Sequence, residues 1–133
     1  MATETATVQT PESNGIQTTA AIVFGGVLAL VGVLGPALGG ANGELVVFGR
    51  NYLHDVVHLG SGLAGLAAGY AAGGKYAGTY SKVLGVTYLL VTVIGFVATG
   101  FAASLLNINF ADNLLHLVLA LAFLVIGFGL SQD

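Results

Sequence analysis

The chain has 133 residues, a length that suits one compact domain. Hydrophobic residues make up 56% of it and charged residues only 7%, and the mean hydropathy is +0.92. A soluble domain needs charged side chains over most of its surface, so this composition indicates that most of the surface meets lipid. A net charge of −3 argues against a nucleic-acid partner, and the absence of cysteine excludes disulfides and thiolate metal sites.

In chain order, the first 15 residues are polar and show no apolar period, which predicts a flexible N-terminal tail. Four apolar segments follow at roughly 16–38, 52–72, 81–104 and 113–130. Each has about 20 residues, enough for a helix to cross about 30 Å of hydrocarbon. The sequence therefore predicts an all-α integral membrane domain over residues 16–131, a four-helix transmembrane bundle.

The two halves of this domain resemble each other. The sequence LVGVLG at 30–35 aligns with LVTVIG at 90–95, and FGRNYLHDVVHL at 48–59 aligns with FADNLLHLVLAL at 110–121. An even number of spans in each half gives both halves the same direction through the membrane. We therefore expect two parallel two-helix repeats, one over about 16–73 and one over about 81–130.

Basic residues near the ends of the spans predict the orientation. Lys75 and Lys82 lie in the turn between the second and third segments, on the same side as both termini, whereas Arg50 lies on the other side. The excess of lysine favours cytoplasmic termini and a cytoplasmic turn. The segment around Arg50 would then face the extracytoplasmic side.

The segment RNYLHDVVHLG, residues 50–60, concentrates polar side chains in an apolar chain. His54, Asp55 and His58 share one face of the predicted second helix. His116 starts the fourth helix at the depth of His54 if the repeat is correct, and Asp112 is nearby in the sequence. A polar side chain inside a membrane is rare without a partner, so His54, Asp55, His58, Asp112 and His116 form the candidate polar or ligand cluster.

Three roles fit the histidines. They can bridge helices through hydrogen bonds, they can bind a metal ion or the iron of a haem, or they can pass protons or small solutes. His54 and His58 at i and i+4 suit a shared metal, which His116 would complete. Asn51, Asp112 and Asn113 read as helix-start polar residues that cap free backbone N–H groups.

Small residues line one face of several predicted helices. On the second helix the polar cap continues into a glycine stripe, and small residues also recur along the first and third helices. In lipid this pattern lets neighbouring backbones approach closely. The expected packing glycines are Gly25, Gly32, Gly62, Gly65, Gly69, Gly73, Gly85 and Gly95.

Two motifs resemble those of small four-span membrane proteins classed as domain of unknown function 4383. Asn51, His54, His58 and Leu59 match an N-x-x-H-x-x-x-H-L element, and residues 109–117 match an N-x-A-D-N-x-x-H-L element. The resemblance covers roughly 16–130 and implies a prokaryotic integral membrane protein of the cytoplasmic membrane, with no established reaction. Where such sequences often read V-N-P, this chain has Arg50-Asn51-Tyr52.

The leading functional expectation is a non-enzymatic membrane protein that acts by helix association, with itself or with a membrane-protein partner. The first alternative is a metal- or haem-binding protein that uses His54, His58 and His116. The second is a small-solute or proton pathway through the bundle. The lipid bilayer is the expected surrounding in all three.

Overall fold

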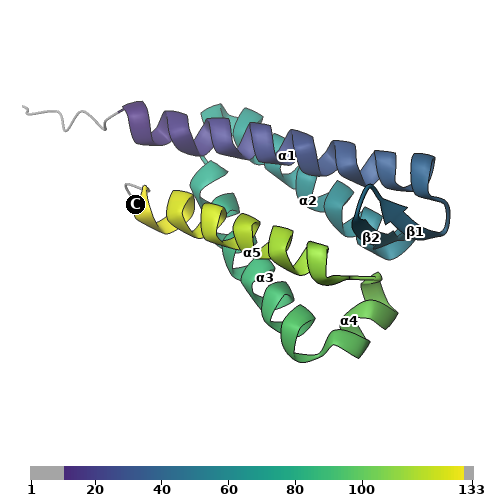
Figure 1. Cartoon of the computed structure of the whole chain (residues 1–133). Helices are drawn as coiled ribbons and strands as arrows, with labels where there is room; N and C mark the ends of the chain where they lie inside the picture. The colour runs from purple at the N-terminus through teal and green to yellow at the C-terminus, as the bar shows by residue number, and fades with distance from the viewer. Residues whose placement is uncertain (1–10, 131–133) are drawn as a thin grey trace, which may run out of the picture.

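The computed structural model describes residues 11–130 and is almost wholly helical (Figure 1). Of the predicted tail over residues 1–15, residues 1–10 lie outside the described part of the chain. Residues 11–15 are helical, because helix α1 (Pro11–Gly39) begins at Pro11, a first position where proline's missing N–H costs nothing. The other elements are β1 (Asn42–Leu45), β2 (Phe48–Asn51), α2 (Tyr52–Tyr70), a 3₁₀ turn (Ala71–Gly74), α3 (Ala77–Val97), α4 (Thr99–Leu106), α5 (Phe110–Leu124) and a π-helical turn (Val125–Gly129).

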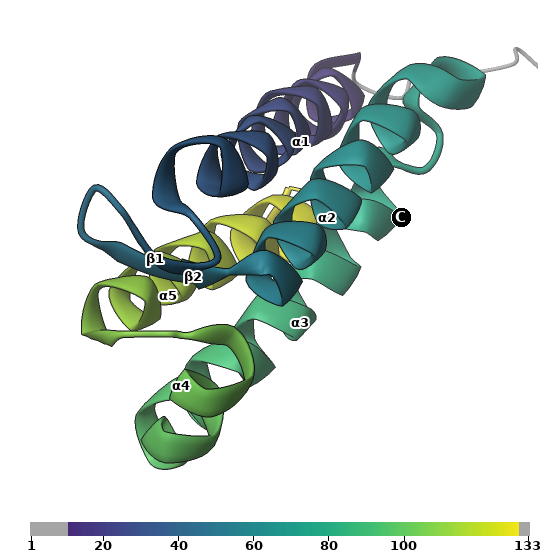
Figure 2. The ribbon, with the colours of Figure 1, turned by 90° about the vertical axis from the view of Figure 1, so that its right-hand side faces the viewer.

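The long helices pack mainly as two antiparallel pairs, α1 with α2 and α3 with α5. The start of α1 and the end of the described chain lie at one end of the molecule. The β1–β2 hairpin and the α4–α5 junction lie at the other end (Figures 1 and 2). A buried cluster at the centre joins the pairs and includes Leu28, Tyr80, Tyr88 and Phe123.

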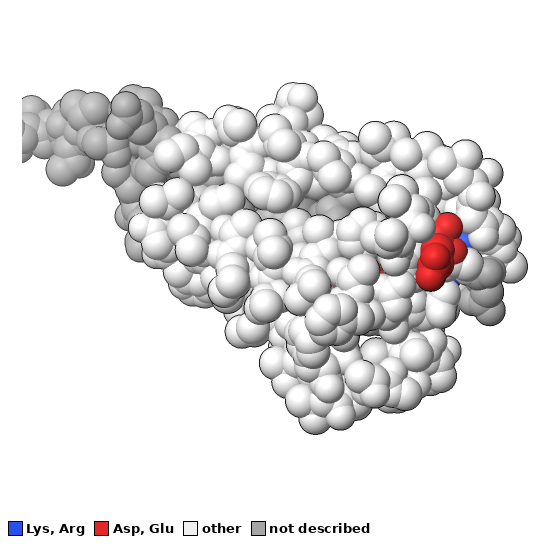
Figure 3. Space-filling view, viewed as in Figure 1, with Lys and Arg blue, Asp and Glu red and all other residues white. Residues whose placement is uncertain are grey.

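Among the described residues, three helical segments are long and apolar enough to cross a membrane, at 15–39, 77–97 and 110–129. Four such segments were expected. Helix α2 has a sufficient length of 19 residues, but its first two turns carry His54, Asp55 and His58 and lower its hydropathy. Many large apolar side chains are exposed around the helices, and the face in Figure 3 is almost wholly uncharged. This surface suits contact with lipid.

The third expected segment, over 81–104, is not one helix. It breaks at Ala98, where φ is −122° and ψ is 58°, between α3 and α4. In a continuous helix the Gly95 carbonyl would accept from Thr99. At the break it accepts instead from Nδ2 of Asn113, at 3.0 Å. The side chain of Asn113 thus satisfies a buried carbonyl near the bend.

Glycines occupy the closest approach of α1 and α2. A Cβ on Gly62 would lie 2.2 Å from the Ala29 nitrogen, and a Cβ on Gly25 would lie 2.8 Å from the Gly62 oxygen. Any side chain at these positions would force the helices apart. Gly73, which was predicted to be one of the packing glycines, lies outside α2 and has a φ of +66°, and a Cβ there would meet no atom of another described residue within 4 Å apart from its chain neighbours.

The hairpin between α1 and α2 was not predicted. Its strands pair Asn42 with Asn51 and Leu45 with Phe48, which leaves Val46 and Val47 as the turn. Val46 has a φ of +62°, a conformation that β-branched residues rarely adopt. The turn is Val-Val, and the Asn-Gly pair of this segment lies at Asn42-Gly43 in β1, so the sequence does not place an Asn-Gly or Asp-Gly signal at the turn.

Candidate metal centre

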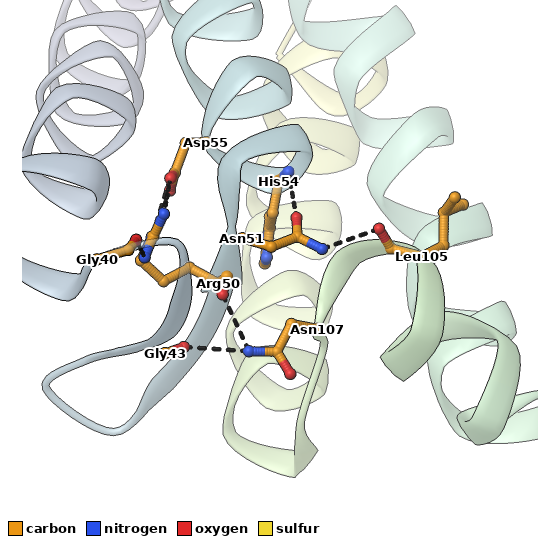
Figure 4. Close-up of polar contacts among 8 residues, drawn as sticks. All are labelled: Gly40, Gly43, Arg50, Asn51, His54, Asp55, Leu105 and Asn107. Atoms are coloured by element: carbon orange, nitrogen blue, oxygen red, sulfur yellow. Dashed lines mark hydrogen bonds and ion pairs between the residues drawn. The ribbon is translucent and has the colours of Figure 1, made fainter.

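The hairpin end of the molecule is held together by side chains that bond to backbone groups (Figure 4). Asn51 caps α2: its Oδ1 accepts from the His54 N–H at 2.9 Å, and its Nδ2 donates to the Leu105 carbonyl at 3.0 Å. Nδ2 of Asn107 donates to the carbonyls of Gly43 and Arg50. These bonds fix the first turn of α2 against the junction between α4 and α5.

Helix α5 begins with a capping box. Its N-cap is Asn109, whose Oδ1 accepts from the Asp112 N–H, and Oδ2 of Asp112 accepts from the Asn109 N–H. Oδ2 also accepts from the Gly49 N–H at 3.0 Å, which ties the hairpin to α5. Asn113, expected to cap this helix, lies one turn further in and bonds to Gly95 instead. The expectation for Asn113 rested on aligning it with Asn51, whereas Asn109 occupies the equivalent N-cap position.

Asp55 does not join the histidines. It lies on the α1 side of α2, where Nε of Arg50 donates to its two carboxylate oxygens at 2.9 and 3.1 Å. Arg50 also donates to the Gly40 carbonyl, and the carboxylate of Asp55 raises the pKa of the guanidinium. Gly35 leaves room for this buried pair, since a Cβ there would lie 2.2 Å from Oδ1 of Asp55.

His54, His58 and His116 lie together between α2 and α5. Their ring centroids are 4.4 Å apart for His54 and His58, 5.6 Å for His54 and His116, and 6.1 Å for His58 and His116. Each ring offers a nitrogen that lies within 4.8 Å of the other two. The first two residues are one helical turn apart on α2, and the third comes from α5, so the tertiary fold is needed to complete the group.

The imidazoles carry unsatisfied nitrogens. His54 and His116 are each 2% exposed. Both ring nitrogens of His54 and Nδ1 of His116 are buried without a hydrogen-bond partner in the described structure, although the Leu106 carbonyl is close to His54. A buried polar atom without a partner costs about 1–3 kcal/mol. A metal ion bound through one nitrogen of each ring would remove part of that cost.

A cavity of about 30 Å³ lies beside the three rings. Tyr88 of α3 also lines it, with its ring centroid 5.4 Å from that of His116. The Tyr88 hydroxyl is buried and has no hydrogen-bond partner of acceptable geometry within residues 11–130, although Ser61 is near. A tetrahedral zinc site places its nitrogens about 3.3 Å apart, so small side-chain rotations would bring the three imidazoles onto one ion.

Residues to which the sequence argument gave no role at the site also shape this region: Gly35, Arg50, Tyr88, Asn107 and Asn109. Arg50 was noted for its charge and as a departure from the family pattern, although Asp55 five residues later in the sequence offered a partner. Tyr88 carried no local signal, because a tyrosine in an apolar segment is typical of packing.

The helices and their exposed apolar side chains define a helical membrane protein. The family model of domain of unknown function DUF4383 matches residues 18–129, and the chain belongs to this family. No curated protein and no solved structure matches this chain.

Proposed function

We propose that this protein is a membrane protein that binds one divalent transition-metal ion through His54, His58 and His116. The observation that carries the proposal is the cluster of three imidazoles with one nitrogen each within 4.8 Å of the others, in which His54 and His116 have buried nitrogens without a hydrogen-bond partner among the described residues. Neutral imidazole is a common ligand of zinc, copper, nickel and cobalt, whereas calcium and magnesium prefer oxygen.

The site would hold the ion with three nitrogens and leave a fourth position open. A water molecule at that position needs little space, and about 30 Å³ is the volume of one water in the liquid. The Tyr88 hydroxyl, which has no hydrogen-bond partner among the described residues, belongs to a residue that lines the same cavity and can hydrogen-bond to such a water. A haem suits the site less well, because a porphyrin ring is far larger than this cavity.

The other two expectations have less support. The glycines of the α1–α2 pair face each other within the chain, so they do not offer a free stripe for a partner. A pathway across the membrane needs an opening beyond the histidines. On that side two rings pack against Phe123: Tyr80 edge to face with a centroid distance of 5.7 Å, and Tyr88 stacked with a centroid distance of 6.2 Å. We therefore favour a binding site over a channel.

We further propose that α2 crosses the membrane as a fourth span, beside α1, in the cytoplasmic membrane of a prokaryote. The close packing of α1 and α2 along their whole length supports this arrangement. The lysine bias then places the hairpin and the metal site near the extracytoplasmic surface, with both termini in the cytoplasm.

The test is Co²⁺ titration of the purified protein in detergent, followed by visible absorption and by metal analysis after desalting. We expect one ion per chain, with d–d bands of a four-coordinate site that has three nitrogen ligands and one water. His54→Ala and His116→Ala should each weaken binding by about 100-fold or more, since each removes a direct ligand and even outer-shell changes cost 10–100-fold. Asn113→Ala is the matched control, a buried polar change on α5 outside the site. Wild-type protein that binds no more Co²⁺ than His54→Ala would contradict the proposal.

A further inference from the structure

A second cavity, of about 230 Å³, lies under the hairpin between α1, α2 and α5. Its wall includes Val31 of α1, Val46 and Phe48 of the hairpin, and Leu115 of α5. His58 lines both this cavity and the smaller one beside the imidazoles. The larger cavity therefore reaches the proposed metal centre through one of its ligands.

Two carboxylates lie near this cavity, that of Glu44 at the surface and that of Asp112 in the cavity wall. Glu44 is exposed on the hairpin, and it lies close enough to Asp112 for their charges to interact. Asp112 is 2% exposed and lines the cavity. Its Oδ2 accepts hydrogen bonds from the backbone N–H groups of Gly49 and Asn109. Its Oδ1 accepts no hydrogen bond from a described residue. In Figure 3 acidic atoms appear on the surface at the hairpin end.

The positive charge at this cavity is already neutralised. Arg50 lines the wall together with Asp55, and its guanidinium is bound to that carboxylate and to the Gly40 carbonyl. Glu44 and Asp112 are thus left as the uncompensated charges among the described groups around the cavity. Their field favours a cation.

The volumes suit an ion that loses water as it moves inward. Six water molecules of a hydrated divalent ion occupy about 180 Å³ at about 30 Å³ each, which the larger cavity can hold. The cavity at the histidines, about 30 Å³, can hold one. An ion must therefore exchange most of its waters for protein ligands as it moves from the larger cavity to the one at the histidines.

We propose that the cavity under the hairpin is the route by which a hydrated divalent transition-metal ion reaches the three histidines. Glu44 attracts the ion, the free oxygen of Asp112 replaces a water, and His58 is the first nitrogen to bind. The ion then passes to His54 and His116 and releases the carboxylate, with no change in its charge. This inference rests on the proposed metal-binding function.

The test is the rate of Co²⁺ uptake by the metal-free full-length protein, measured by stopped-flow absorption in detergent. Val31→Phe fills the cavity, and we expect it to slow both uptake and release by about tenfold or more while the equilibrium affinity changes little. Val33→Phe is the control, because Val33 lies on the same helix and is 53% exposed. It should load at the wild-type rate.

A second variant tests the carboxylate. Asp112→Asn keeps an oxygen that can accept from Gly49 and Asn109, so the capping box can survive, but it removes the charge. We expect Asp112→Asn to take up Co²⁺ more slowly. Adding Glu44→Gln to this variant should make the uptake rate depend less on salt. Wild-type rates in both Val31→Phe and Asp112→Asn would overturn the route while leaving the metal site in place. A wild-type protein without Co²⁺ binding would instead overturn the site itself.

Discussion

The buried ion pair between Arg50 and Asp55 is the most consequential contact between single residues outside the histidines. The side chains of the pair are 4% and 6% exposed, and they lie against Gly35 of α1. Breaking a buried pair by removing one partner commonly costs 3–5 kcal/mol, because the other charge stays buried without compensation. The pair thus makes the junction of the hairpin, α1 and α2 sensitive to single substitutions.

We expect Arg50→Met to lower the free energy of unfolding by about 3 kcal/mol, since it leaves the Asp55 carboxylate alone in the interior. The double variant Arg50→Met/Asp55→Asn should be less destabilised than this single variant, because the amide carries no charge. Unfolding in mixed micelles with increasing denaturing detergent measures both. A double variant less stable than the single would show that the pair does not act through its charges.

At the level of elements, the α1–α2 contact depends on positions where no side chain fits. Gly62 faces the backbone of Ala29, whereas a Cβ on Gly60, two residues earlier on the same helix, would have no atom within 4 Å among the described residues other than the local backbone of α2. The two glycines therefore give a matched pair for testing how close the helices lie. Helix propensity alone would predict that replacing either glycine with alanine has the same effect on stability.

We expect Gly62→Ala to destabilise the protein by about 1–3 kcal/mol, as overpacking in a close contact does. Gly60→Ala should instead be neutral or stabilise the helix by up to about 1 kcal/mol, because alanine is the better helix former. Thermal unfolding of both variants in the same detergent compares them. Equal shifts would contradict the close approach of α1 and α2.

At the scale of the whole molecule, the number of crossings decides where the hairpin lies. If α2 spans the membrane, the hairpin and the turn at 71–76 face opposite sides. If it does not, they face the same side. The chain has no cysteine, so single introduced cysteines report on each loop separately.

Glu44→Cys and Lys75→Cys place a thiol at an exposed position in each loop. With a membrane-impermeant maleimide on intact cells, we expect labelling of Glu44→Cys and labelling of Lys75→Cys only after lysis. Equal labelling of both in intact cells would contradict a fourth span. The reverse pattern would keep four spans and invert the proposed orientation.

The expected repeat was a useful but imperfect guide to the histidine site. Aligning the two halves predicted that His54 and His116 lie at the same end of the molecule, and the structure places their rings 5.6 Å apart. The same alignment paired Asn51 with Asn113, although the N-cap of α5 is Asn109. A one-turn shift keeps similar residues on one face of a helix, so the pattern alone cannot locate the cap.

Composition and spacing were enough to predict that the chain is helical, that its surface is apolar, and that its few polar side chains gather near the starts of two helices. These properties follow from composition and periodicity, which act locally. The folded chain was needed to show that Asp55 pairs with Arg50 while His58 lies near His116, that α3 breaks at Ala98, and that a hairpin covers a cavity beside the histidines. Each depends on contacts between segments far apart in the chain, where the geometry of packing and the need to satisfy buried polar groups select one partner among several.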